Sequence, residues 1–185
     1  MNIAISNRQH SKKINSRFLK QVATELFAEL GITEAELGIN LVGAREMALV
    51  NETFLQHEGP TDVITFDHRD VVAQASRRCV PGSKKPTHRR DACTTVIHGE
   101  LFICVDVALS QAKEFKSSWQ AEVVRYLVHG VLHLLGHDDL KPHLRRKMKR
   151  EENRLVRKLT KKISLAQIEP VRFPSDEFPN ICNRL

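Results

Sequence analysis

The segment at residues 118–139 constrains the fold of this chain more than any other part of its sequence. Apolar residues recur there at helical spacing from about Ser118 to Leu135, and Gly136 follows as a natural helix end. His129 and His133 stand four residues apart within this stretch. One helical turn separates them, so the sequence predicts a long helix with two imidazoles on the same face near its end.

Two imidazoles at this spacing can bind one metal ion without any rearrangement of the backbone. Three histidines and two aspartates fall within residues 129–139, and the glycine allows the chain to turn back with a third ligand. Two imidazoles and one further ligand leave a coordination position open, as in catalytic zinc sites, whereas structural zinc normally has four protein ligands. We therefore predict a catalytic metal site; the simpler alternative is that the histidines are ordinary surface or core residues.

Two residues compete for the third ligand position, His137 and Asp139. In an unbroken helix His137 would extend a row of side chains along one face, whereas tetrahedral coordination requires ligands that converge from different directions. Gly136 is expected to end the helix before His137. Asp139 lies three residues beyond this glycine, which is far enough for a reversed chain to present its carboxylate to the histidines.

Hydrophobic periodicity predicts the other elements, which are intermixed without strict alternation of strands and helices. Strands are expected at about 3–5, 39–41, 62–66 and 100–105, and helices at about 16–30, 44–55, 106–115 and 142–161. Asp106 is interpreted as the cap of the short helix that ends near Phe115. This pattern favours an α+β fold, with a small mixed sheet packed with about five helices and the metal site at the end of the long central helix.

One domain is expected over residues 1–163, because a chain of 185 residues has the usual length for one domain with appendages. Residues 68–95 show no periodicity and contain Pro81, Gly82 and Pro86, so they are interpreted as a flexible basic insertion. Residues 164–185 are rich in proline and polar residues and are expected to form an extended tail.

The net charge of +7 is concentrated in two segments. Residues 68–91 contain seven lysines or arginines and two acids, and residues 141–162 contain eleven and two. Basic charge concentrated in this way is typical of a nucleic-acid partner, although a solvated surface is the alternative. The helix after Pro142 is therefore expected to bind nucleic acid through the basic side chains Arg145, Arg146, Lys149, Arg150, Arg157 and Lys161.

Several classes of protein are disfavoured. No apolar run approaches the roughly 18–20 residues that cross a bilayer, and residues 1–13 lack the apolar stretch of a signal peptide, so a cytoplasmic protein without membrane contact is expected. The four cysteines form no CxxC pair, which disfavours disulfides and a four-cysteine metal site. Cys104 is interpreted as a small buried hydrophobic residue.

Residues 129–138 (HGVLHLLGHD) resemble the pattern H-G-x-L-H-L-x-G-[YH]-D-H of the YbeY family of metal-dependent single-strand endoribonucleases. Residues 51–54 (NETF) and 61–66 (TDVITF) are similar to the family's L-N-x-x-[YF] and T-D-V-L-S-F signatures, and residues 99–103 (GELFI) to its G-D-I-x-I strand. The likeness covers about residues 37–160. Two positions depart from it: Asp139 replaces the final histidine, and Leu55-Gln56 replace an Arg-Gly pair that many members have.

The resemblance implies a single-strand-specific metal-dependent endoribonuclease that acts in ribosomal RNA maturation and ribosome quality control. It implies one zinc ion, with His129, His133 and Asp139 as ligands, and single-stranded RNA, ribosomal RNA and the small ribosomal subunit as partners. It also places an acid at the start of the 100–105 strand, so Glu100 is a candidate catalytic base or supporting group. An ordinary carboxylate at a strand edge is the equal alternative for Glu100.

Other functions compete with this interpretation. A zinc metallopeptidase is disfavoured because Gly130 stands where the H-E-x-x-H motif has its catalytic glutamate. A ribosome-associated RNA-binding factor with a mainly structural metal would lack an open coordination position. An iron oxygenase with two histidines and one carboxylate is chemically possible, but no other feature of the sequence indicates it.

Overall fold

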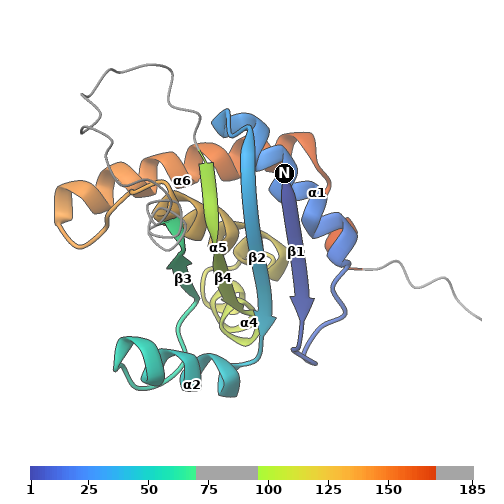
Figure 1. Cartoon of the computed structure of the whole chain (residues 1–185). Coiled ribbons are helices and arrows are strands. Elements are labelled where there is room, and N and C mark those ends of the chain that lie inside the picture. The colour runs from blue at the N-terminus through green and yellow to red at the C-terminus, as the bar shows by residue number, and fades with distance from the viewer. Residues whose placement is uncertain (70–95, 170–185) are drawn as a thin grey trace, which may run out of the picture.

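The computed structural model describes residues 1–69 and 96–169. In chain order the elements are β1 (Asn2–Asn7), α1 (Ser16–Leu30), β2 (Glu34–Val42), α2 (Ala44–Leu55), β3 (Val63–Asp67), β4 (Val96–Cys104), α4 (Val105–Glu114), α5 (Trp119–Leu134), α6 (Pro142–Lys162) and the 3-10 helix η1 (Leu165–Ile168). The strands form one sheet in the order β1-β2-β4-β3. β3 runs antiparallel to β4, and the other pairs are parallel (Figure 1).

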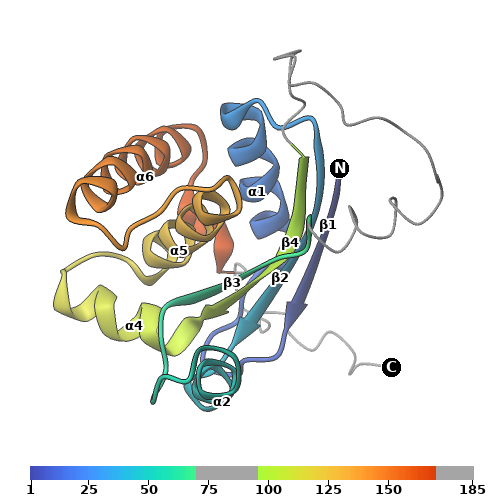
Figure 2. The same cartoon turned by 60° about the vertical axis from the view of Figure 1, so that its left-hand side comes forward.

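The two faces of the sheet have different surroundings. Buried and more exposed residues alternate along β2 and β4, as expected for strands with one covered face. Helices α1, α4, α5 and α6 cover this face, with α5 in the middle of the layer (Figure 2). Helix α2 lies at one end of the sheet, where Met47 packs with Val42, Ile64 and Cys104. The main core therefore lies between the sheet and α5.

The α+β fold with a small mixed sheet is confirmed, and the described residues contain five α-helices. The structure also confirms that Cys104 is fully buried, and burial raises the pKa of its thiol. Strands β2 and β4 are longer than predicted, because their pairing continues back to Glu34 and Val96. No helix in the described ranges has the length and apolar character needed to span a membrane.

The predicted role of Asp106 is wrong. The residue lies inside the first turn of α4, and Cys104 occupies the N-cap position. The Asp106 carboxylate instead accepts a 2.7 Å hydrogen bond from the backbone N–H of Ala44, at the start of α2. Gly43, the N-cap residue of α2, has no side chain that could do this, so the aspartate caps a different helix from the one expected.

The expected extended tail is wrong for its first residues. Leu165–Ile168 form η1, in which Ile168 is fully buried against the core. The backbone carbonyl of Ile168 accepts a 2.7 Å hydrogen bond from the N–H of Asn15, just before α1. An apolar side chain in a polar segment thus attaches this turn to the domain. Residues 170–185, and all but the first two residues of the predicted insertion at 68–95, lie outside the described ranges.

Candidate metal centre

Helix α5 crosses the sheet at close range, and Gly130 allows the approach. A Cβ atom at this position would lie 2.7 Å from Cδ2 of Leu101 and 3.3 Å from Oγ1 of Thr65. A larger residue would force the buried Leu101 side chain or the helix to shift. The glycine stands directly after His129, so the close contact fixes the part of α5 that carries the histidines.

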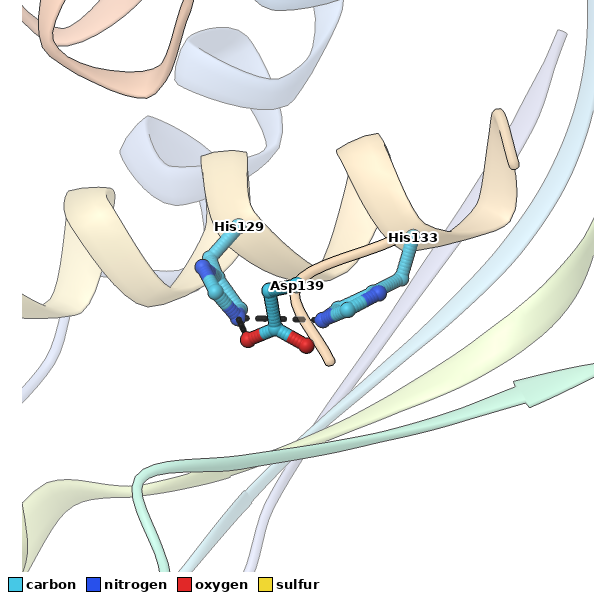
Figure 3. Close-up of side chains that lie close together, drawn as sticks. All are labelled: His129, His133 and Asp139. Atoms are coloured by element: carbon cyan, nitrogen blue, oxygen red, sulfur yellow. Dashed lines mark hydrogen bonds and ion pairs between the residues drawn. The ribbon is translucent and has the colours of Figure 1, made fainter. Parts of the chain in front are cut away.

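The end of α5 turns the chain back on itself. Gly136 has φ +85°, and its N–H donates to the carbonyl of His133 at 2.8 Å. The next N–H, of His137, donates to the carbonyl of Leu132 at 3.0 Å. A left-handed glycine with these reverse bonds satisfies the last carbonyls of a helix and redirects the chain. The returning loop places Asp139 beside the two histidines (Figure 3).

Three potential ligand atoms converge at this point. The Nε2 atoms of His129 and His133 are 3.0 Å apart, and Oδ2 of Asp139 lies 3.9 Å from Nε2 of His129. One ligand atom from each residue lies within 4.8 Å of the other two. Tetrahedral zinc with Zn–N bonds of about 2.0–2.1 Å would separate two nitrogens by about 3.3 Å. The spacing therefore suits a single ion.

The opposite ring nitrogens of both histidines have their own partners. Nδ1 of His133 lies 3.0 Å from the backbone carbonyl of His137, which can only accept a hydrogen bond, so this nitrogen donates. Nδ1 of His129 lies 3.0 Å from Oε2 of Glu152 on α6. With the protons on Nδ1, both Nε2 lone pairs face each other, an arrangement that a cation between them would stabilise.

The charges around Glu152 affect the protonation of the site. Burial raises the pKa of Glu152, but hydrogen bonds from His129 and Arg125 outweigh it and hold the pKa below its usual value. Burial lowers the pKa of His129, but the Glu152 carboxylate outweighs it and leaves the pKa raised. For His133, burial and then the neighbouring His129 lower the pKa, which favours the neutral ring that a metal needs.

A pocket of about 240 Å³ opens beside His129 and Asp139. Arg145 and Lys149 line it from α6, and Asp62 lines it from the residue directly before β3. Oδ1 of Asp62 accepts hydrogen bonds from the side chain of its neighbour Thr61 and from the N–H of Val63. The three candidate ligands thus adjoin a space that a small group of a substrate could enter.

The structure brings His129, His133 and Asp139 together but places Glu100 elsewhere. Leu101 faces α5, so its neighbour Glu100 projects from the opposite face of the sheet. There its carboxylate lies 3.5 Å from the side-chain amide of Asn40. The expectation that Glu100 serves the metal site is therefore not supported, because a strand that begins with the right residue type can still present it to the wrong face.

Sequence reasoning missed Asp62 and Glu152, and it named Arg145 only as one of six basic side chains on the last helix. A signal for Glu152 was present: it lies at helical spacing with the buried Met148 and Leu155, so an acid falls on the apolar face of α6. Such an acid normally has a buried partner. No sequence pattern indicated that Asp62 and Arg145 line the pocket, because that contact depends on tertiary structure.

The upstream motif holds the chain next to the site. The buried Asn51 donates from its side-chain amide to the carbonyl of Gly59 at 2.8 Å. Gln56 ends α2 with φ +57°, at the position where the resembling family often has glycine. A left-handed conformation is easier for glycine than for glutamine, which gives this departure a small backbone cost.

Comparisons with known proteins identify a family. A family model described as "Endoribonuclease YbeY" matches residues 4–160. A protein of that name from Salinibacter ruber is 28% identical over 154 residues, which cover 83% of this chain and 89% of the relative. One from an Anaeromyxobacter species is 31% identical over 157 residues, which cover 85% and 71%.

A solved structure shares the fold. The solution structure of a Thermotoga maritima protein has a TM-score of 0.57 and 20% sequence identity, and the match covers 95% of this chain and 99% of that one. The family model spans far more than half of the 185 residues, and the matched range includes the residues that build the site. The chain therefore belongs to the YbeY endoribonuclease family.

Proposed function

We propose that this protein is a zinc-dependent endoribonuclease that cleaves single-stranded RNA. The observation that carries the proposal is the convergence of two imidazole nitrogens and one carboxylate beside a pocket lined by cationic side chains. The names of the relatives, all endoribonucleases, agree with this chemistry. A role in ribosomal RNA maturation and ribosome quality control, with the small ribosomal subunit as partner, is part of the same proposal.

His129, His133 and Asp139 would hold the ion. When bound, zinc supplies a Lewis acid that polarises a phosphoryl oxygen or lowers the pKa of a water molecule. Glu152 and the carbonyl of His137 hold the two rings in the orientation that presents Nε2 to the site. A carboxylate in place of the family's final histidine makes the ligand set one unit more negative.

Asp62 is a better candidate than Glu100 for accepting a proton from the attacking water. It lines the same pocket as His129 and Asp139. Both hydrogen bonds of its carboxylate within the described chain use Oδ1, so Oδ2 is available to a water or substrate hydroxyl. A carboxylate within reach of the reacting group is the first requirement for a general base.

The competing functions fit the geometry less well. A peptidase of the H-E-x-x-H type would need a glutamate at position 130, which is glycine here and where a Cβ atom would lie 2.7 Å from Cδ2 of Leu101. A mainly structural metal would need four protein ligands, and the group of potential ligands within the described ranges has three members. Three ligands beside a pocket favour an enzyme.

The test combines metal analysis of the purified protein with two cleavage assays. We expect one zinc ion per chain, degradation of single-stranded RNA and no degradation of casein. The variant His133→Ala should lose both metal and RNA cleavage, which excludes a contaminating nuclease. RNA cleavage that survives in this variant, or casein cleavage by the metal-loaded protein, would contradict the proposal.

A further inference from the structure

The basic residues of α6 divide into two groups by their partners. In the second half of the helix, Lys158 and Lys162 pair with Glu29 of α1, at 2.8 Å and 2.6 Å. In the first half, Arg145 and Lys149 line the pocket beside the metal centre, and neither forms an ion pair with any residue in the described ranges. The first group stabilises the fold, whereas the second leaves positive charge available at the pocket.

Arg145 is held in place by the metal-binding loop itself. Its Nε donates to the backbone carbonyl of Asp139 at 3.0 Å. This bond positions the guanidinium next to a candidate ligand and leaves its terminal N–H groups for another acceptor. Lys149 lies one helical turn further on the same side of α6, so both cations reach the same space.

The acids of the pocket do not neutralise the cations of α6. Glu152 is bound by Arg125 at 2.5 Å and by His129 at 3.0 Å. Asp139 belongs to the candidate ligand group, and Asp62 lines the pocket from the residue directly before β3 rather than from α6. The wall formed by α6 therefore presents unmatched positive charge, which is suited to a compact anion.

We propose that Arg145 and Lys149 bind one phosphate of the RNA backbone that adjoins the phosphate being cleaved. The inference rests on the proposed function and names a substrate subsite within it. A guanidinium fork and an ammonium group together match the charge and oxygen geometry of a phosphodiester.

The test pairs charge variants of the protein with charge variants of the RNA. The double variant R145Q/K149Q removes the subsite. R146Q/R150Q is the matched control, since it removes the same charge at the same spacing from exposed positions of the same helix that do not line the pocket. The probe is a labelled single-stranded oligoribonucleotide in which one linkage at a time is an uncharged methylphosphonate.

In the wild-type protein we expect one neutral linkage next to the cleaved one to lower kcat/KM about tenfold, because it removes a charge-assisted hydrogen bond. In R145Q/K149Q the same neutral linkage should have no further effect, whereas in R146Q/R150Q the tenfold loss should remain. Circular dichroism would verify that both variants fold. A loss of equal size in all three proteins would overturn the subsite.

Binding of the same oligonucleotides, followed by fluorescence anisotropy, separates this inference from the proposed function. If the wild-type protein binds RNA but never cleaves it, the proposed endoribonuclease activity is refuted. The subsite would still be supported if the neutral linkage weakens RNA binding by the wild-type protein but not by R145Q/K149Q. Cleavage without any such coupling would refute the subsite alone.

Discussion

Glu152 connects the metal centre to the neighbouring helix, since its carboxylate contacts both His129 and Arg125. A carboxylate that holds a ligating imidazole typically strengthens metal binding about 10–100-fold. We therefore expect Glu152→Gln to weaken zinc affinity by about this factor, as measured by competition with a chelator. Glu151→Gln is the control, because the adjacent Glu151 pairs with Arg154 instead. Equal affinities in the two variants would contradict this role.

Asp139 and His137 provide a second comparison between neighbouring residues. The carboxylate of Asp139 belongs to the converging group, whereas the backbone carbonyl of His137 is the part that contacts His133. Asp139→Ala should lose most of the bound zinc, and His137→Ala should retain it, because a backbone carbonyl survives the substitution. Zinc content after gel filtration measures both. If His137→Ala lacks zinc and Asp139→Ala retains it, the third ligand is the imidazole of His137.

Asp62 and Glu100 are the two carboxylates considered as a catalytic base. Asp62 lines the pocket, and Glu100 projects from the opposite face of the sheet. Asp62→Asn should lower kcat by about 10²–10⁴-fold at unchanged zinc content, the usual contribution of a general base. Glu100→Gln should cleave RNA at nearly the wild-type rate. A large loss of kcat in Glu100→Gln but not in Asp62→Asn would support Glu100 as the catalytic base, as the sequence motif suggested.

The same residues show what could be predicted from sequence at this scale. The spacing of His129 and His133 and the position of Gly136 depend only on local helix geometry, and these features predict the observed convergence. Glu152 lies 23 residues after His129, and no local pattern connects the two. Glu100 is a candidate only through its position in a motif, and the alternation with buried Leu101 places it on the opposite face of the sheet.

At the scale of elements, α1 and α6 are joined by Glu29, which bridges Lys158 and Lys162. Hydrogen bonds from these lysines lower the pKa of Glu29 to about 2. A carboxyl group whose pKa is lower in the folded protein stabilises it above the ordinary pKa of 4.5, and this stabilisation is lost as the pH falls towards 2.

Glu29→Gln should therefore lower the free energy of unfolding at pH 6, and the difference from wild type should shrink between pH 4.5 and 2. Urea denaturation at pH 6 and pH 3 measures it. Glu25→Gln is the control on the same helix, since Glu25 is more exposed and lies 3.7 Å from Lys162. A difference that stays constant between the two pH values would show that the ion pairs do not cause it.

Most elements could be predicted because their periodicity is local. Helix α1 has a buried face at regular spacing between Asn15 and Gly31, which cap its two ends, and its bounds agree with the prediction. The errors fall where a distant partner decides the outcome. Asp106 caps α2 from a position 62 residues further along the chain. Helix η1 forms where the Ile168 side chain is buried in the core beside α1.

For the whole molecule, the topology was harder to predict than its elements. Periodicity indicates that a strand exists but not which strand lies beside it. Here β2 pairs with β4, across α2 and β3, to give the order β1-β2-β4-β3. This crossover places α5 over the central strands, so the arrangement that positions the metal centre depends on pairing between residues about 60 positions apart.

The strand order also predicts how the chain tolerates replacement of residues 70–95. Strands β3 and β4 are antiparallel neighbours, Asp67 pairs with Gly99, and the N–H of His68 donates to the carbonyl of His98 at 2.8 Å. The chain therefore leaves and re-enters the sheet on adjacent strands, which a short loop can join. Because a long insertion changes loop-closure entropy little, a short Gly/Ser loop should keep the melting temperature within about 5 °C.

The same replacement should weaken RNA binding, because residues 70–95 contain six arginines or lysines and two acids. Each lost phosphate contact should reduce the slope of log affinity against log salt by about 0.7 for single-stranded RNA. A Gly/Ser loop of the original length separates charge from length, since it should bind RNA as weakly as the short loop. Unchanged RNA affinity in both proteins would show that residues 70–95 do not contribute to RNA binding. A collapse of soluble yield would show that these residues pack into the core.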